Sequence, residues 1–202
     1  MDEFKKPLKG LNPKIEVDQQ EFLEMQCDAA IGRFVKEFEF LTSMIRDFLK
    51  PCLLRLGWEK AKINNQFAKL PTGGLINLLE KYKEAFPDDK KGNEALQNFI
   101  SILEKVNEGR IQLLHGYHMV DIPGNSFTTT KAIYMKDIGK KIHVTLLHTS
   151  HELDHWVKIM SMMSRELWMA RENVKKSKSI HKSLVAGNYD RFKLPELGEK
   201  IL

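Results

Sequence analysis

Two short stretches of the sequence carry side chains whose spacing could support chemistry. The first, TSHELDHW at positions 149–156, contains H-E-x-x-H, in which His151 and His155 lie one helical turn apart and could share a zinc ion. Glu152 would then be the general base of a zinc hydrolase. The second, GRIQLLHG at positions 109–116, places Arg110 five positions before His115. A histidine can move protons at neutral pH and an arginine can hold a phosphate, so this pair has the groups for metal-independent phosphodiester cleavage.

The HELDH stretch has a simpler interpretation as the start of a helix. Thr149 and Glu152 have the spacing of a capping box, in which each side chain satisfies a backbone N–H of the other residue. Glu152 and Asp154 also complement the positive end of a helix dipole. The extended zinc motif does not continue in WVKIMSMMSR, although His148 offers one more nitrogen. We therefore expect no metal and no other cofactor, and keep a zinc hydrolase as a third alternative.

A long helix is predicted to position the first half of the chain. It would begin near Asp18, which has capping-box spacing to Glu21, and Pro51 is expected to end or kink it. Residues 56–72 have a mixed pattern that finishes at the PTGG break, and a second apolar stripe predicts a helix over 75–86. The apolar face of the long helix recurs every three or four residues and consists of Ile31, Phe34, Val35, Phe38, Leu41, Ile45, Phe48 and Leu49.

The stretch with Arg110 is predicted to lie in a third helix. This helix would be capped by Asn93, interrupted or bent at Gly109, and resumed up to about Met119, with Arg110 near the start of the resumed part. The segments FTTTKAIYM and KIHVTLLHT are rich in β-branched residues and flank KDIGK, which predicts a β-hairpin at about 126–148.

A last long helix is expected over about 150–175. Its apolar face would contain Leu153, Trp156, Val157, Met160, Met163, Leu167 and Ala170. The predicted fold class is therefore mainly α: a helical bundle with a β-hairpin inserted before the last long helix. It would form a single domain over 18–186, preceded by an irregular arm over 1–17 and followed by a loosely ordered tail over 187–202.

Composition and charge set broad limits on the class of protein. The 202 residues carry a net charge of +5, much of it between Asn173 and Lys193. Within that segment the lysines of 175–182 could contact RNA phosphates or form a solvated helix end. Cys27 and Cys52 lie in helical patterns and not in a CxxC pair, which argues against a disulfide scaffold. MDEFKKPLKG has no apolar region of a signal peptide, and no run is long enough to span a bilayer. We expect a cytoplasmic protein without a membrane partner.

Arg110, His115 and the Gly-Tyr that follows, set in a late helix of a helical domain, resemble the HEPN superfamily of RNA-associated domains. The resemblance extends over roughly 18–175 and rests on few specific residues. Active members of that family are metal-independent endoribonucleases that work as dimers with the two motifs facing each other. By this resemblance Arg110 would contact the phosphate of an RNA substrate and His115 would be the acid–base group. A homodimer through the long first helix or the motif helix is implied, in an endoribonuclease of a stress or defence system that could have an antitoxin partner.

Three further residues are candidate accessory groups of this site: Glu39, Tyr117 and His118. Glu39 lies in the long first helix and could neighbour the His115 face and tune its pKa. Ile111 departs from the family pattern, because active members usually have a polar residue after the arginine. This departure leaves open a non-catalytic, HEPN-like module that binds RNA or protein.

Overall fold

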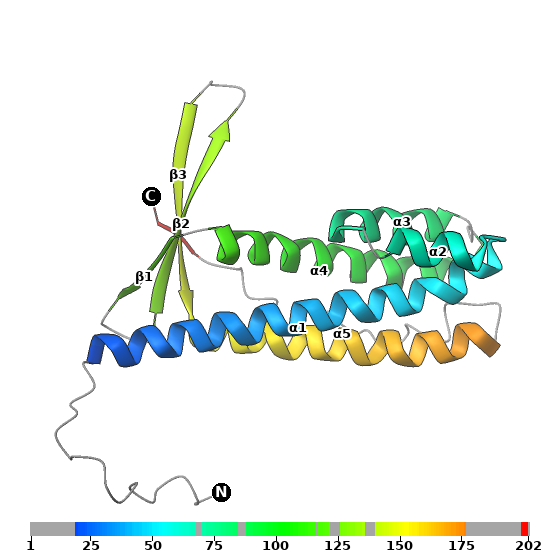
Figure 1. Ribbon diagram of the computed structural model, residues 1–202, viewed down its shortest axis with the longest axis horizontal. Coiled ribbons are helices and arrows are strands. Elements are labelled where there is room, and N and C mark those ends of the chain that lie inside the picture. The colour runs from blue at the N-terminus through cyan, green and yellow to red at the C-terminus, as the bar shows by residue number, and fades with distance from the viewer. Residues whose placement is uncertain are drawn as a thin grey trace, which may run out of the picture.

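The computed structural model describes residues 19–67, 70–84, 88–115, 117–121, 126–135, 140–176 and 199–201. This part of the chain is mainly helical, as predicted (Figure 1). The helices are α1 (Gln19–Arg55), α2 (Lys60–Phe67), α3 (Thr72–Glu84), α4 (Lys90–His115) and α5 (Ser150–Lys176). The strands are β1 (Tyr117–Asp121), β2 (Ser126–Met135), β3 (Lys140–Thr149) and β4 (Glu199–Ile201). The predicted arm over 1–17 and the cap at Asp18 lie outside the described residues.

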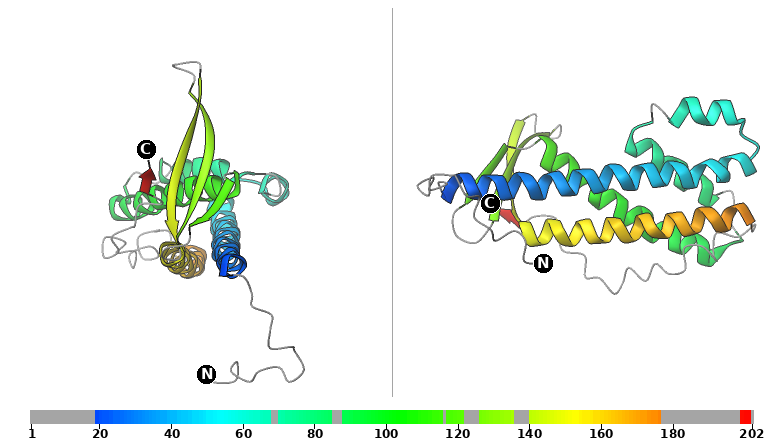
Figure 2. Two further views of the ribbon diagram at one scale, coloured as in Figure 1. Left: turned by 90° about the vertical axis from the view of Figure 1, so that its left-hand side faces the viewer. Right: turned by 60° about the horizontal axis from the view of Figure 1, so that its bottom comes forward.

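The two longest helices, α1 and α5, lie side by side and run in the same direction (Figures 1 and 2). Two contacts mark their alignment: Arg33 Nη2 lies 3.0 Å from Asp154 Oδ1, and Arg171 Nη1 lies 4.0 Å from Asp47 Oδ2. Helix α4 runs in the opposite direction, and α3 packs against both α4 and α1. The bundle therefore has one helix, α1, that contacts each of the other four helices.

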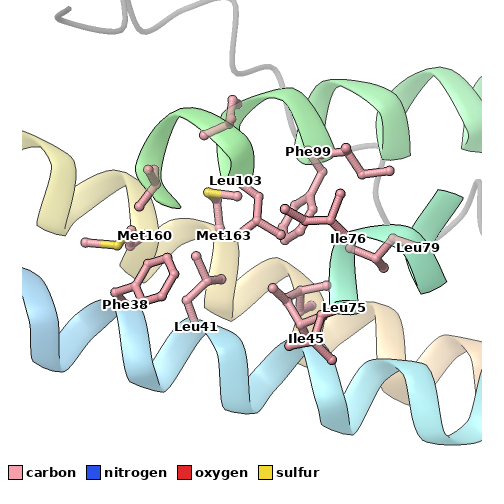
Figure 3. Packing of buried hydrophobic residues seen from close by; sticks show 14 of the residues in the cluster. Phe38, Leu41, Ile45, Leu75, Ile76, Leu79, Phe99, Leu103, Met160 and Met163 are labelled. Atoms are coloured by element: carbon pink, nitrogen blue, oxygen red, sulfur yellow. The ribbon is translucent and has the colours of Figure 1, made fainter. Parts of the chain in front are cut away.

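The core is formed where the apolar faces of α1, α3, α4 and α5 meet (Figure 3). The stripe predicted for α1 is largely buried, and so is the stripe predicted for α5, including Met160 and Met163. Burial of each large apolar side chain contributes about 1.5–3 kcal/mol, so this shared face accounts for the bundle arrangement. Side chains that meet at its centre are Phe38, Leu41, Ile45, Leu75, Ile76, Leu79, Phe99, Leu103, Met160 and Met163.

The end of α1 is set by a glycine and not by the proline. Pro51 lies inside the helix, which continues to Arg55, so of the two predicted effects Pro51 does not end the helix, and a kink there stays a prediction. Gly57 has a φ of 84°; its N–H donates to Leu54 O at 3.1 Å and the next N–H, of Trp58, donates to Leu53 O at 3.0 Å. These two bonds form a Schellman motif, in which only glycine adopts the left-handed conformation without steric cost.

The limits of the middle helices also differ from the predictions. Asp89, and not Asn93, caps α4: its Oδ1 accepts the N–H of Gly92 at 3.1 Å. Gly109 is buried inside α4 and does not interrupt it, and α4 ends at His115 instead of near Met119. The short helix α2 has no counterpart in the predictions, and the two glycines of PTGG lie in the first turn of α3 instead of in a break.

A four-stranded antiparallel sheet, in the order β1-β2-β3-β4, lies at one end of the bundle (Figures 1 and 2). Strands β2 and β3 pair from Ser126↔Thr149 to Met135↔Lys140. The predicted hairpin falls on these strands, but it stays a prediction because 136–139, where its turn would lie, are outside the described residues. Residues 199–201, within the segment 187–202 predicted to be a loosely ordered tail, form β4, in which Ile201 pairs with Thr145; the rest of that segment is outside the described residues.

Among the described residues, no helix is long and apolar enough to cross a membrane.

The packing predicts a large loss of stability for the replacement of one leucine of α4 and a small loss for another. Leu103 is 0% exposed and Leu114 is 42% exposed, both on α4. Leu103→Ala should lower the free energy of unfolding by about 2–5 kcal/mol, because it leaves a cavity in the shared core. Leu114→Ala should change it by about 0.5 kcal/mol or less, as is usual for a surface substitution. Urea denaturation followed by circular dichroism measures both, and equal losses would contradict the described core.

Candidate functional site

Arg110 is held against α1 by two different contacts. Its Nη2 lies 3.2 Å from Glu39 Oε1, and its guanidinium carbon lies 5.1 Å from the centre of the Phe38 ring. Its Nε is buried without a hydrogen-bond partner, and 28% of the side chain is exposed. Glu39, expected near His115, thus lies beside Arg110 and balances its charge. This pairing leaves Arg110 a modest surface for a phosphate.

His115 lies on the other side of α4 from Arg110. Positions five apart differ by about 140° around a helix and by about 7.5 Å along its axis. Arg110 is on the side that carries buried Val106 and Leu113, whereas His115 is exposed, on the side of exposed Glu104 and Glu108. One copy of the chain therefore does not aim the arginine and the histidine at the same point.

The position of the pair along α4 also differs from the prediction. Arg110 and His115 lie in the last turns of α4, not in the first turn of a resumed helix. The negative end of the helix dipole is located there, and it disfavours a bound phosphate. Ile111, half-buried, lies one turn before His115, and its apolar side chain can make no hydrogen bond with the imidazole.

The two accessory residues after the motif lie in the sheet. Tyr117 and His118 belong to β1, where they pair with Thr130 and Thr129 of β2. Gly116, between α4 and β1, is outside the described residues. Because α4 ends at His115 and Tyr117 belongs to a strand, Tyr117 does not continue the helical face of the motif.

The HELDH stretch begins α5 through the predicted capping box. The N–H of Glu152 donates to Thr149 Oγ1 at 3.1 Å, and the N–H of Thr149 donates to Glu152 Oε2 at 3.5 Å. Asp154 accepts two hydrogen bonds from Arg33, at 3.1 and 3.0 Å. Both acidic residues therefore have structural partners, and the capping box is confirmed.

No group of three or more His, Cys, Asp or Glu side chains that could hold a metal occurs among the described residues. His151 is exposed and His155 is half-buried on α5. The cysteines are buried and free, and burial raises the pKa of Cys27 to about 11 and that of Cys52 to about 12. Neither thiol is therefore ionised near neutral pH, and the ionised form is the one that acts as a nucleophile or metal ligand.

Comparisons with known protein families, with curated proteins and with solved structures found no match to this chain.

The sequence did not indicate Phe38 as a partner of Arg110, and it did not indicate the hollow that is lined by Trp58, Asn77 and Lys81. The only signal for the first was that Phe38 and Glu39 are adjacent, so that one can lie below a guanidinium and the other beside it. Nothing in the sequence indicates that Arg110 lies opposite them, because the two segments are 71 positions apart.

The capping box predicts a specific loss of stability. Thr149→Val keeps the β-branched shape that suits the end of β3 but removes the hydroxyl, and should lower the free energy of unfolding by about 0.5–2 kcal/mol. Ser161→Ala, which removes an exposed hydroxyl from the middle of α5, should have no such cost. Urea titrations compare the two variants, and an equal effect would mean that the cap does not stabilise α5.

Proposed function

We propose that the chain is a non-catalytic, HEPN-like helical module that self-associates through the outer face of α1. The observation that carries this proposal is an exposed apolar stripe on α1, on the side away from the core. The HEPN-like part is supported by the R-x4-H spacing of Arg110 and His115 within a mainly helical domain. The non-catalytic part is supported by the position of His115, which is exposed on the other side of α4 from Arg110.

The outer stripe of α1 has the spacing of a helix-pairing seam. Its members follow one another at intervals of three or four residues, as the contact positions of a coiled coil do. Three are large and apolar, with 52% of Phe22, 62% of Met25 and 53% of Phe40 exposed. Only Lys36 is charged. The seven exposed positions are Phe22, Met25, Ala29, Gly32, Lys36, Phe40 and Ser43.

The stripe matches a second, antiparallel copy of itself. Phe22 and Phe40 are equally far from position 31, so a two-fold axis there would place each phenylalanine opposite the other one of the second copy. Ala29 and Gly32 would lie near that axis, and a Cβ added to Gly32 meets nothing within 4 Å. Small residues at the crossing point let two helices approach closely, and Lys36 would then lie within one turn of Asp28 of the second copy. A parallel pairing would instead place the two Lys36 side chains together.

Self-association through this face has a matched control in the same chain. Phe40→Glu should convert a dimer to a monomer, or weaken it by about tenfold or more, because it buries a charge without a partner in the interface. Trp168→Glu changes an aromatic residue of similar exposure, 55%, on α5 and should leave the dimer intact. Analytical ultracentrifugation at micromolar concentration measures both. A monomeric wild-type chain, or equal effects of both substitutions, would refute the proposal.

A second candidate function is metal-independent cleavage of RNA. The observation that favours it is the approach of Glu39 to Arg110, which puts a carboxylate base beside a phosphate-binding cation. Cleavage by attack of the ribose 2′-hydroxyl also needs an acid for the leaving oxygen, and His115 of a second copy would have to supply it. RNA cleavage therefore depends on a dimer that brings His115 of one copy to Arg110 of the other. The non-catalytic module needs no such approach of the histidine.

Incubation with total RNA in excess EDTA separates the two candidates. If the chain does not cleave, the wild type and Arg110→Ala/His115→Ala should leave the RNA equally intact. The control variant, Arg165→Ala/His151→Ala, removes the same two residue types from exposed positions of α5. EDTA-resistant cleavage that only the Arg110/His115 variant loses would establish the ribonuclease and overturn the non-catalytic proposal.

A further inference from the structure

A hollow of about 530 Å³, with a mainly apolar surface and several polar side chains at its edge, lies between α2 and α3. These helices are at the end of the bundle away from the sheet (Figure 1), so the hollow is separate from the Arg110–Glu39 pair. Its described lining consists of Trp58, Asn65, Gln66, Leu70, Gly74, Asn77, Leu78 and Lys81. Trp58 also lines a smaller hollow, of about 310 Å³, together with Gly57, Glu59 and Lys62.

Beside the apolar residues Leu70, Gly74 and Leu78, the lining of the larger hollow carries three kinds of group that could recognise a ligand. Asn65, Gln66 and Asn77 are exposed, and their side-chain amides make no hydrogen bond within the described part of the chain. Each amide can donate and accept at the same time. Lys81 is the one charged residue of the described lining, which contains no carboxylate. The third kind of group is aromatic, the indole of Trp58.

The position of Trp58 follows from the end of α1. The N–H of Trp58 donates to Leu53 O at 3.0 Å as part of the Schellman motif, so the turn at Gly57 fixes the backbone that carries the indole. Lys62, which lines the smaller hollow, places its Nζ 5.5 Å from the centre of the indole ring. The half-buried ring is therefore held by backbone and side-chain contacts before any ligand arrives.

We propose that the larger hollow binds a nucleotide: a base against Trp58, with its edge facing the amides and its phosphate at Lys81. A volume of about 530 Å³ is within the range of small-molecule sites. Asparagine and glutamine pair with the donor and acceptor edges of bases, aromatic rings stack with bases of any sequence, and a lysine ammonium binds phosphate as a point charge. The smaller hollow is unsuitable because Glu59 would repel the phosphate. This site goes beyond the proposed self-association and needs no dimer.

The same chemistry could come from a free nucleotide or from a single-stranded RNA. Binding of AMP is measured by isothermal titration calorimetry, and binding of a fluorescein-labelled single-stranded RNA octamer by anisotropy, both on the full chain. AMP binding about as tight as octamer binding would assign the site to free nucleotides. Octamer binding that is much tighter would assign it to a strand of RNA. Binding of neither probe would overturn the proposal.

Two substitutions locate the site, each with a matched control. Trp58→Ala should weaken the binding of whichever probe binds more tightly by about tenfold or more, because the stacking contact is lost. Lys81→Gln should weaken the binding of that probe and make the binding depend less on salt concentration. Trp168→Ala and Lys60→Gln change an exposed tryptophan and lysine outside the lining and should have no effect.

A third substitution, Asn77→Ala at an exposed helix position, checks the same site if Trp58→Ala unfolds the end of α1. This substitution should weaken the binding of the same probe, because it removes the amide that would face the base edge. Binding that none of Trp58, Lys81 and Asn77 affects would refute the site even if the chain binds RNA elsewhere.

Discussion

The burial of one face of α1 is the constraint on which the rest of the structure depends. This helix has 37 residues and contacts each of the other helices in the described part of the chain. Phe34, Phe38, Leu41, Ile45 and Phe48 on that face are fully buried. Because such packing fixes how far each neighbouring helix can slide along α1, it also decides which polar side chains meet across the bundle. The exposed ion pairs, such as Arg33–Asp154, follow from this alignment and stabilise it little.

The surroundings of Arg110 show how this alignment decides which residues a motif residue contacts. In the sequence, Arg110 and His115 form a pair that could act on a phosphodiester. In the bundle, Arg110 belongs with Glu39 and Phe38 of α1, and His115 points away from α1 at the last residue of α4. An arginine that is partly desolvated over an aromatic ring and paired with a carboxylate stabilises the contact between α4 and α1. The same burial leaves the opposite face of α1 in solvent, where its apolar stripe is the strongest feature that points to a partner.

The helix ends show which local signals could be used without the structure. The capping box at Thr149 and Glu152 was predictable because both members lie within one turn and satisfy each other's backbone. The end of α1 was not, because proline and glycine signals competed: Pro51 lies where the helix can omit one hydrogen bond, and Gly57 makes the left-handed turn. At the start of α4, Asp89 and Asn93 are both residue types that cap helices, and they lie one turn apart. The structure has Asp89 as the cap, and the neighbouring sequence does not decide between the two.

By itself the sequence determined the mainly helical class, the buried stripes of α1 and α5, and the capped start of α5. These depend on the periodicity of apolar residues and on contacts within one turn, which any window of the sequence contains. Only the tertiary structure decided that Arg110 pairs with Glu39, that 199–201 add a strand to the sheet, and that Trp58 shares one hollow with three amides and a lysine. Each of these depends on how far one helix or strand is shifted and rotated against another. That alignment results from the burial of many side chains together and is not contained in any single motif.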